Sequence, residues 1–151
     1  MSNFIETFRG RVTPQECDHL GHMNVQFYVA KVSDAAWTVM HAIGMTPDYI
    51  RTRRKALAAV RQDITYLREL KAGDLVVIES GVLEAGEKKV TFYHRMNNVE
   101  TGVLAMTAKV LTVNMDLDKR RAEPLAPEIR ERAQSLRLCS GQAYRVREEG
   151  A

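Results

Sequence analysis

The strongest constraint on the fold is one change of hydrophobic period along the chain. From Val25 to Ile43, apolar residues recur at three- and four-residue steps, which predicts one amphipathic helix of about 19 residues with a long buried face. Asn24 is suited to cap the start of this helix, and Gly44 is suited to end it. After residue 55 the period becomes two. The chain therefore combines one dominant helix with a series of strands.

Short polar turns separate the period-two segments. The sequence predicts strands over 4–13, 56–70, 75–83, 88–97 and 103–115, with turns at 71–74, 85–87 and 98–102. It also predicts two short helices, over 48–54 and 128–138, each introduced by a proline. Turns this short imply antiparallel pairing of successive strands. The expected fold class is α+β, with an antiparallel sheet of about five strands and a helix on one face.

Length and composition fit one globular domain. The chain has 151 residues, of which 45% are hydrophobic, and it shows no repeat, no linker, no secretory signal and no apolar run of the roughly 18 residues that span a bilayer. The two cysteines, Cys17 and Cys139, lie too far apart for a disulfide framework. We therefore expect a cytoplasmic protein with reduced thiols, and no membrane partner.

A mild positive charge gives no clear sign of nucleic-acid binding. The net charge is +3, and much of the excess comes from arginines between residues 130 and 147. A solvated surface is the favoured interpretation, and a polyanionic small molecule is the alternative. No nucleic-acid partner is expected.

The segment 17–24, Cys-Asp-His-Leu-Gly-His-Met-Asn, holds the best candidate for chemistry. Asp18 would lie just ahead of the long helix, near the positive end of its dipole and its free amides. Such a carboxylate stays ionised and can act as a base or a nucleophile, while the amides can stabilise an oxyanion. Gly21 would allow a ligand to approach the backbone closely. From the residues alone, a purely bracing role for Asp18 is equally well supported.

Other chemistries lack their signatures. His19 and His22 match no known zinc spacing, so no metal is expected, and the sequence has neither a nucleophile elbow nor a glycine-rich phosphate loop. We expect structural roles for the remaining histidines, His41 and His94. Trp37 and Tyr28 are predicted to belong to the core, with an aromatic pocket wall as the alternative.

The segment from Asp18 to Tyr28 resembles the Asp-x-x-Gly-His-x-Asn-x-x-x-Tyr signature of hotdog-fold acyl-CoA thioesterases, in the 4-hydroxybenzoyl-CoA thioesterase class. The resemblance runs from about Phe4 to about Glu128 and includes the order of the elements. It implies a hotdog fold, in which the sheet wraps around one long central helix. We expect this domain to occupy 1–138, followed by a flexible tail over 139–151.

The resemblance also implies an activity. Members of the family hydrolyse an acyl-CoA thioester to a free acid and coenzyme A, without a metal or an organic cofactor. Asp18 matches the catalytic carboxylate, which attacks the thioester carbonyl or activates a water molecule. The residues that match substrate-binding positions are His22, Asn24, Tyr28, Lys88 and Lys89. For the two lysines, a role as ordinary solvated turn residues stays open.

The chain departs from the family pattern at two positions. Many relatives have a second asparagine where this chain has Val25, and an acid where it has Ser33, with Asp34 one step later. The family further implies edge-to-edge homodimers, often paired into tetramers, with the site at the interface.

Three alternatives to a thioesterase remain at this stage. Because fold does not fix function, the same fold would also suit a hydratase or dehydratase that uses Asp18 and His22. A non-catalytic acyl-CoA-binding module is the second alternative, and nucleic-acid binding is a weaker third. The sequence leaves the acyl group open.

Overall fold

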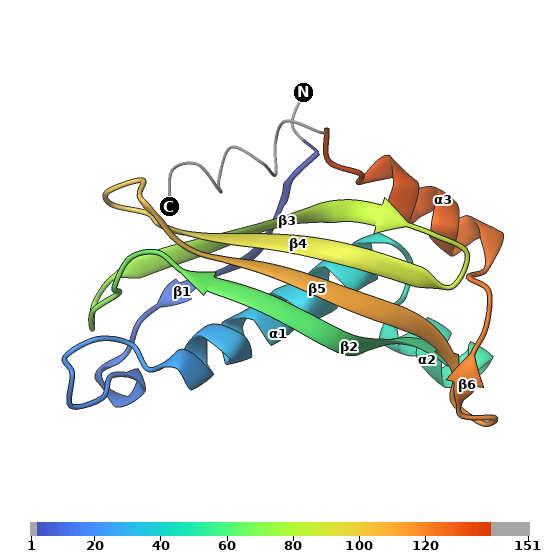
Figure 1. Ribbon diagram of the computed structural model, residues 1–151, viewed down its shortest axis with the longest axis horizontal. Helices are drawn as coiled ribbons and strands as arrows, with labels where there is room; N and C mark the ends of the chain where they lie inside the picture. Colours follow the sequence, from blue (N-terminus) through green and yellow to red (C-terminus); the bar gives the residue numbers. More distant parts are fainter. Residues whose placement is uncertain (1–2, 140–151) are drawn as a thin grey trace.

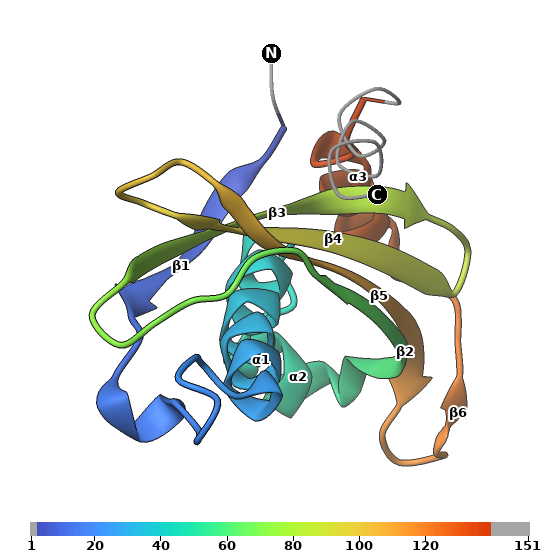
Figure 2. The same ribbon diagram turned by 60° about the vertical axis from the view of Figure 1, so that its left-hand side comes forward.

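Helix α1 (Val25–Ala42) lies in the hollow of a curled sheet in the computed structural model, which describes residues 3–139 (Figures 1 and 2). Both predicted caps are confirmed. The Asn24 side chain accepts a hydrogen bond from the Gln26 amide, and Gly44 follows the helix with a φ of +93°. The buried face of α1 packs against strands β1, β3 and β4. A single helix therefore fills the concave side of the sheet, as predicted.

The sheet has five long strands and one short one. They are β1 (Ile5–Arg11), β2 (Lys55–Tyr66), β3 (Leu75–Ala85), β4 (Lys89–Asn98), β5 (Leu104–Asp116) and β6 (Arg121–Ala122). All pairs are antiparallel, and the order across the sheet is β1-β3-β4-β5-β2, with β6 on the end of β5. The predicted α+β class and the hotdog arrangement are both confirmed.

The pairing of successive strands was predicted wrongly at one place. β2 pairs with β5, and β3 pairs with β1, so β2 and β3 are not neighbours. β2 also ends at Tyr66 and not at Leu70. The reason is local, because the amides of Leu67 and Arg68 both donate to the carbonyl of Ala105 and the ladder stops there. The short strand β6 was not expected.

Two short helices flank the far end of α1. Thr46 caps α2 (Pro47–Arg53) by accepting from the Tyr49 amide. Helix α3 (Pro127–Ser135) is shorter than predicted, because residues 136–138 leave the helix and bind the edge of β3. There the Val82 amide donates to the Leu136 carbonyl at 3.0 Å. This contact covers β3 beyond the end of β1. The predicted tail over 139–151 lies outside the described residues, except for Cys139.

The core lies between α1 and the concave face of the sheet. Tyr28 is 3% exposed and belongs to it, as predicted, but Trp37 is 54% exposed, so its assignment to the core was wrong. The large apolar side chains of β2 that remain exposed are Val60 and Tyr66. His41 lies exposed on α1, whereas His94 on β4 is fully buried. Within the described residues, no helix is long and apolar enough to cross a membrane.

Candidate active site

The loop that precedes α1 folds back on itself around Asp18. The Asp18 amide donates to the His22 carbonyl at 3.2 Å, and the Gly21 amide donates to the Asp18 carbonyl at 3.0 Å. Gly21 has a φ of +85°, which favours glycine, and no atom lies within 4 Å of where its Cβ would be. The turn is therefore tight, and the space beside Gly21 is open.

Both carboxylate oxygens of Asp18 accept a hydrogen bond. Oδ2 accepts from Asn24 Nδ2 at 2.9 Å, and Oδ1 accepts from the Leu20 amide at 2.9 Å. Both bonds hold the pKa of Asp18 below its ordinary value, and the bond from Asn24 has the larger effect. Because the side chain stays partly exposed, it is an ionised carboxylate that a ligand can reach.

Asn24 connects this carboxylate to the start of α1. Its Oδ1 accepts from the Gln26 amide at 3.1 Å while its Nδ2 donates to Asp18. The described residues supply no acceptor for the neighbouring amide of Val25. This free donor, one residue after Asn24, lies at the positive end of the helix dipole, where it can bind a developing negative charge.

His22 and Tyr28 lie at the same end of α1. The His22 ring is half-buried, and its Nδ1 lies 3.2 Å from the Met23 carbonyl. Tyr28, one turn into α1, packs edge-on against Tyr66 of β2 with ring centroids 5.0 Å apart. Burial raises the pKa of Tyr28. The structure thus gathers four of the six predicted site residues around the start of α1.

Lys88 and Lys89 do not join them within one chain. Both are exposed at the β3–β4 turn, at the opposite end of the sheet from the start of α1 (Figure 1). The same turn is bound to the segment before α3, since the Leu125 amide donates to the Glu87 carbonyl. Any contact between these lysines and a ligand at Asp18 would need a long ligand or a second chain.

Sequence reasoning missed an ion pair below the loop. Glu16, in the 3-10 turn η1 (Pro14–Glu16), lies 2.6 Å from Lys31 of α1. The signal for Glu16 was present, because Thr13-Pro-Gln-Glu16 has the spacing of a capping box, and this box is formed. Lys31 gave no such signal, since it occupies a position on the apolar face of the helix.

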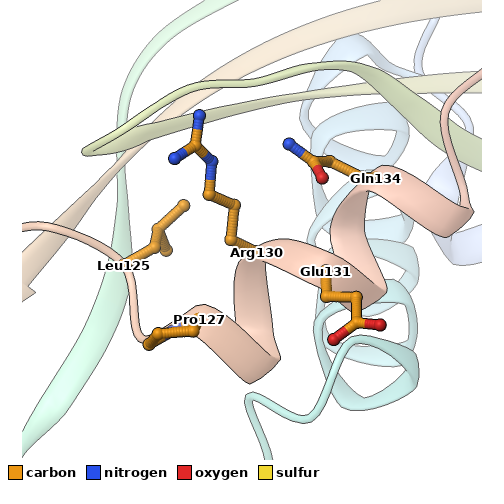
Figure 3. A pocket seen from close by; sticks show the side chains of 5 residues that line it. All are labelled: Leu125, Pro127, Arg130, Glu131 and Gln134. Carbon is orange, nitrogen blue, oxygen red and sulfur yellow. The ribbon is translucent and has the colours of Figure 1, made fainter.

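A surface pocket of about 260 Å³ lies elsewhere, against α3 (Figure 3). Its lining residues are Leu125, Pro127, Arg130, Glu131 and Gln134. None of the predicted site residues lines it. Among residues 3–139, no group of three His, Cys, Asp or Glu side chains is placed to hold a metal ion.

Solved structures with the same fold include a protein in complex with CoA and a protein named as a CoA thioesterase. A hypothetical protein from Staphylococcus aureus in complex with CoA superposes with a TM-score of 0.82 at 19% identity, covering 92% of this chain and 89% of that one. A 1,4-dihydroxy-2-naphthoyl-CoA thioesterase from Synechocystis superposes with a TM-score of 0.74 at 16% identity, covering 85% and 95%. At these identities the likeness concerns the fold.

Curated relatives are longer proteins. An L-carnitine dehydrogenase/betainyl-CoA thioesterase from Ruegeria pomeroyi is 29% identical over 134 residues, which are 89% of this chain and 26% of the relative. The protein of the same name from Agrobacterium fabrum is 27% identical over 112 residues, which are 74% of this chain and 23% of the relative. The chain thus spans about a quarter of their length.

A family model adds a direct assignment. The model of the thioesterase-like superfamily matches residues 12–133, a segment that includes Asp18, all the predicted substrate-binding residues and most of the sheet. The chain therefore belongs to the thioesterase-like superfamily.

Proposed function

We propose that this protein hydrolyses an acyl-CoA thioester to a free carboxylic acid and coenzyme A, with Asp18 as the catalytic carboxylate. The observation that carries the proposal is the accessible Asp18 carboxylate, which two hydrogen bonds keep ionised just before the start of α1. Membership of the thioesterase-like superfamily supports it. The finer assignment to the 4-hydroxybenzoyl-CoA class remains a prediction.

Two routes use the same groups. In the first, an Asp18 oxygen attacks the thioester carbonyl, the C–S bond breaks to release the coenzyme A thiolate, and water then hydrolyses the mixed anhydride. In the second, Asp18 takes a proton from water as that water attacks the carbonyl, and the C–S bond then breaks to release the acid and the coenzyme A thiolate. In both, the Val25 amide would donate to the carbonyl oxygen as negative charge develops on it.

The test compares the wild type with Asp18→Asn on a panel of short, branched, long and aromatic acyl-CoA esters, with free thiol detected by a dye. Because positioned bases contribute about 10²–10⁴-fold to rate, we expect kcat to fall at least about 100-fold. Asp34→Asn is the matched control, since Asp34 is an exposed acid on α1, and it should keep its turnover. Near wild-type turnover by Asp18→Asn would refute the mechanism.

For the acyl group we propose a small cationic one, such as betainyl. Two curated relatives are named betainyl-CoA thioesterases. Tyr66, which is 44% exposed and contacts Tyr28, offers an aromatic ring near the start of α1. Aromatic faces attract quaternary ammonium groups by cation–π interaction.

Betainyl-CoA and 3,3-dimethylbutanoyl-CoA have acyl groups of similar shape, but only the first carries a positive charge. A comparison of their rates therefore tests the role of the charge. We expect kcat/KM to favour betainyl-CoA by about 10-fold or more, as desolvated cation–π contacts allow. Tyr66→Leu should remove most of that preference while it preserves hydrolysis of the isostere. Equal rates for the two esters would contradict the cationic assignment but leave the thioesterase proposal in place.

We also propose a homodimer formed through the free edge of β2, with dimers able to pair into tetramers. Among residues 3–139, β2 pairs with β5 alone. A two-fold axis at this edge would place β2 of the two chains antiparallel to each other. The Asp18 end of one chain would then lie beside the Lys88 end of the other. Lys88 and Lys89 of the partner subunit would then be placed to bind the phosphates of coenzyme A.

Two variants test this assembly. Val60→Lys adds a charge to the exposed edge and should shift the mass measured by light scattering toward the monomer. Lys88→Glu/Lys89→Glu should raise KM for acyl-CoA but leave KM for a short acyl-pantetheine unchanged. Lys119→Glu, an exposed lysine in the turn before β6, is the control.

Three further assays test the alternative functions. Loss of the enoyl absorbance of crotonyl-CoA would indicate a hydratase. A thermal shift with acyl-CoA but no thiol release would indicate a binding module. Salt-sensitive binding to nucleic acid would indicate the third alternative. A cytoplasmic location remains a prediction.

A further inference from the structure

A buried ion pair lies at the base of the Asp18 loop. The Lys31 ammonium is 2.6 Å from Glu16 Oε2, and the two side chains are 8% and 16% exposed. Lys31 is the only lysine or arginine that residues 3–139 bury. Its ammonium also lies 5.5 Å from the centre of the Phe8 ring on β1. The pair therefore ties the turn before the loop to the middle of α1.

Glu16 makes further bonds that reach both ends of the loop. Its Oε1 accepts from the Thr13 amide at 2.8 Å, which closes the turn η1. Its backbone carbonyl accepts from the Asn24 amide at 2.8 Å. Asn24 in turn donates to the Asp18 carboxylate. Glu16 is two residues before Asp18 and holds Asn24, so a displacement of Glu16 would shift both the chain that leads to Asp18 and the side chain that donates to its carboxylate.

Stability alone does not account for such a pair. Removing two charges from water costs about as much as their attraction returns, so apolar residues of similar volume are often as stable or more stable at such a position. A paired charge differs from an apolar contact in specifying one geometry. Here that geometry fixes the loop against α1.

We propose that the Glu16–Lys31 ion pair is a positioning device, which holds the Asp18 carboxylate and Asn24 at the start of α1. The proposal rests on the thioesterase function argued above. Neither Glu16 nor Lys31 touches the reacting atoms. Both act through the placement of Asp18.

The experiment compares Lys31→Met, the double variant Glu16→Gln/Lys31→Met, and Lys31→Arg. Lys31→Met leaves a buried anion without its partner, so it should lower thermal stability. The double variant removes both charges and keeps an acceptor for the Thr13 amide, so stability should recover. Its kcat should nevertheless stay at least about 10-fold below the wild type, with KM changed less than about 3-fold, because small displacements of catalytic groups are costly. Lys31→Arg should retain most of kcat.

Lys55→Met is the control for a merely structural role. Lys55 pairs with Asp116 and Glu123 at the opposite end of the molecule. Its loss should lower stability and leave kcat unchanged. A double variant with restored stability and wild-type kcat would overturn the proposal.

Amide hydrogen exchange gives a readout that does not depend on activity. The amides of Asp18, Gly21 and Asn24 are hydrogen-bonded within the loop or to its base, and the double variant should exchange them faster than Lys55→Met does. Unchanged exchange would overturn the proposal. If the wild type releases no thiol from any ester, the thioesterase function fails, while faster exchange still supports the positioning of the loop by the pair.

Discussion

His94 should make the fold sensitive to mild acid. It lies on β4 with an exposed fraction of 0%, on the same face as Phe92 and Met96, which belong to the core beneath α1. Its Nδ1 lies 2.6 Å from Ser80 Oγ, whereas the described residues give its Nε2 no hydrogen-bond partner. Burial lowers the pKa of His94 from 6.5 to about 4. The native state therefore holds a neutral imidazole.

The magnitude follows from linkage between protonation and folding. Below pH 6.5 the unfolded chain binds a proton at His94, whereas the native state does not bind one there until the pH falls to about 4. The stability linked to neutral His94 is therefore fully present above pH 6.5 and is lost as the pH falls toward 4. Since one pKa unit corresponds to about 1.36 kcal/mol, the expected loss is about 2 kcal/mol at pH 5 and about 3 kcal/mol at pH 4.

Urea unfolding followed by far-ultraviolet circular dichroism would measure this loss between pH 7 and pH 5. Fluorescence is the poorer probe, because the single tryptophan is already 54% exposed in the folded chain. Protein concentration should be held constant, since association would stabilise the native state. Asp18, Glu16 and Asp116, whose pKa values lie below their ordinary ones, affect stability mainly at lower pH than this window.

His94→Gln removes the titrating group and keeps a polar partner for Ser80. Between pH 7 and pH 5, the free energy of unfolding of this variant should therefore fall by about 2 kcal/mol less than that of the wild type. His41→Gln, on the exposed face of α1, should follow the wild type. An unchanged pH dependence in His94→Gln would refute the reasoning. So would a His94 pKa near 6.5 measured by NMR in the native protein.

Two smaller predictions concern the ends of the molecule. Gly81→Ala places a Cβ in overlap with a methyl carbon of Leu138, so it should destabilise the fold by about 1–3 kcal/mol in urea unfolding, and an unchanged midpoint would contradict the packing of residues 136–138 on β3. Thr46→Ala removes the acceptor for the Tyr49 amide and should cost about 1 kcal/mol, whereas Thr46→Ser should cost much less. Equal losses in both Thr46 variants would mean that the cap contributes nothing.

Local signals explain what the sequence predicted well. The period of the apolar residues and the two caps located α1, because both depend on neighbours within one helix. Thr46 and Pro47 located α2 for the same reason. The strand order was missed, because whether β2 pairs with β3 or with β5 depends on contacts between residues forty or more positions apart in the chain, such as Ala58 with Val113.

The site was predicted unevenly for a similar reason. Asp18 and Asn24 lie six residues apart, so a motif could record their proximity, and the structure joins them by a hydrogen bond. Lys31 lies fifteen residues from Glu16 and contacts it only because α1 folds back over β1. No short motif contains that contact, which is why it emerges only from the structure.

The errors in predicted burial are themselves informative. The apolar side chains of Val25, Val29 and Trp37 on α1 are each more than a third exposed. Val60 on the β2 edge is exposed in the same way. At the other edge of the sheet, residues 136–138 cover the part of β3 that β1 leaves free, and β1 is the outer strand along the rest of that edge. Since exposed apolar groups and an open strand edge favour association, these surfaces support the homodimer through β2 that we propose above.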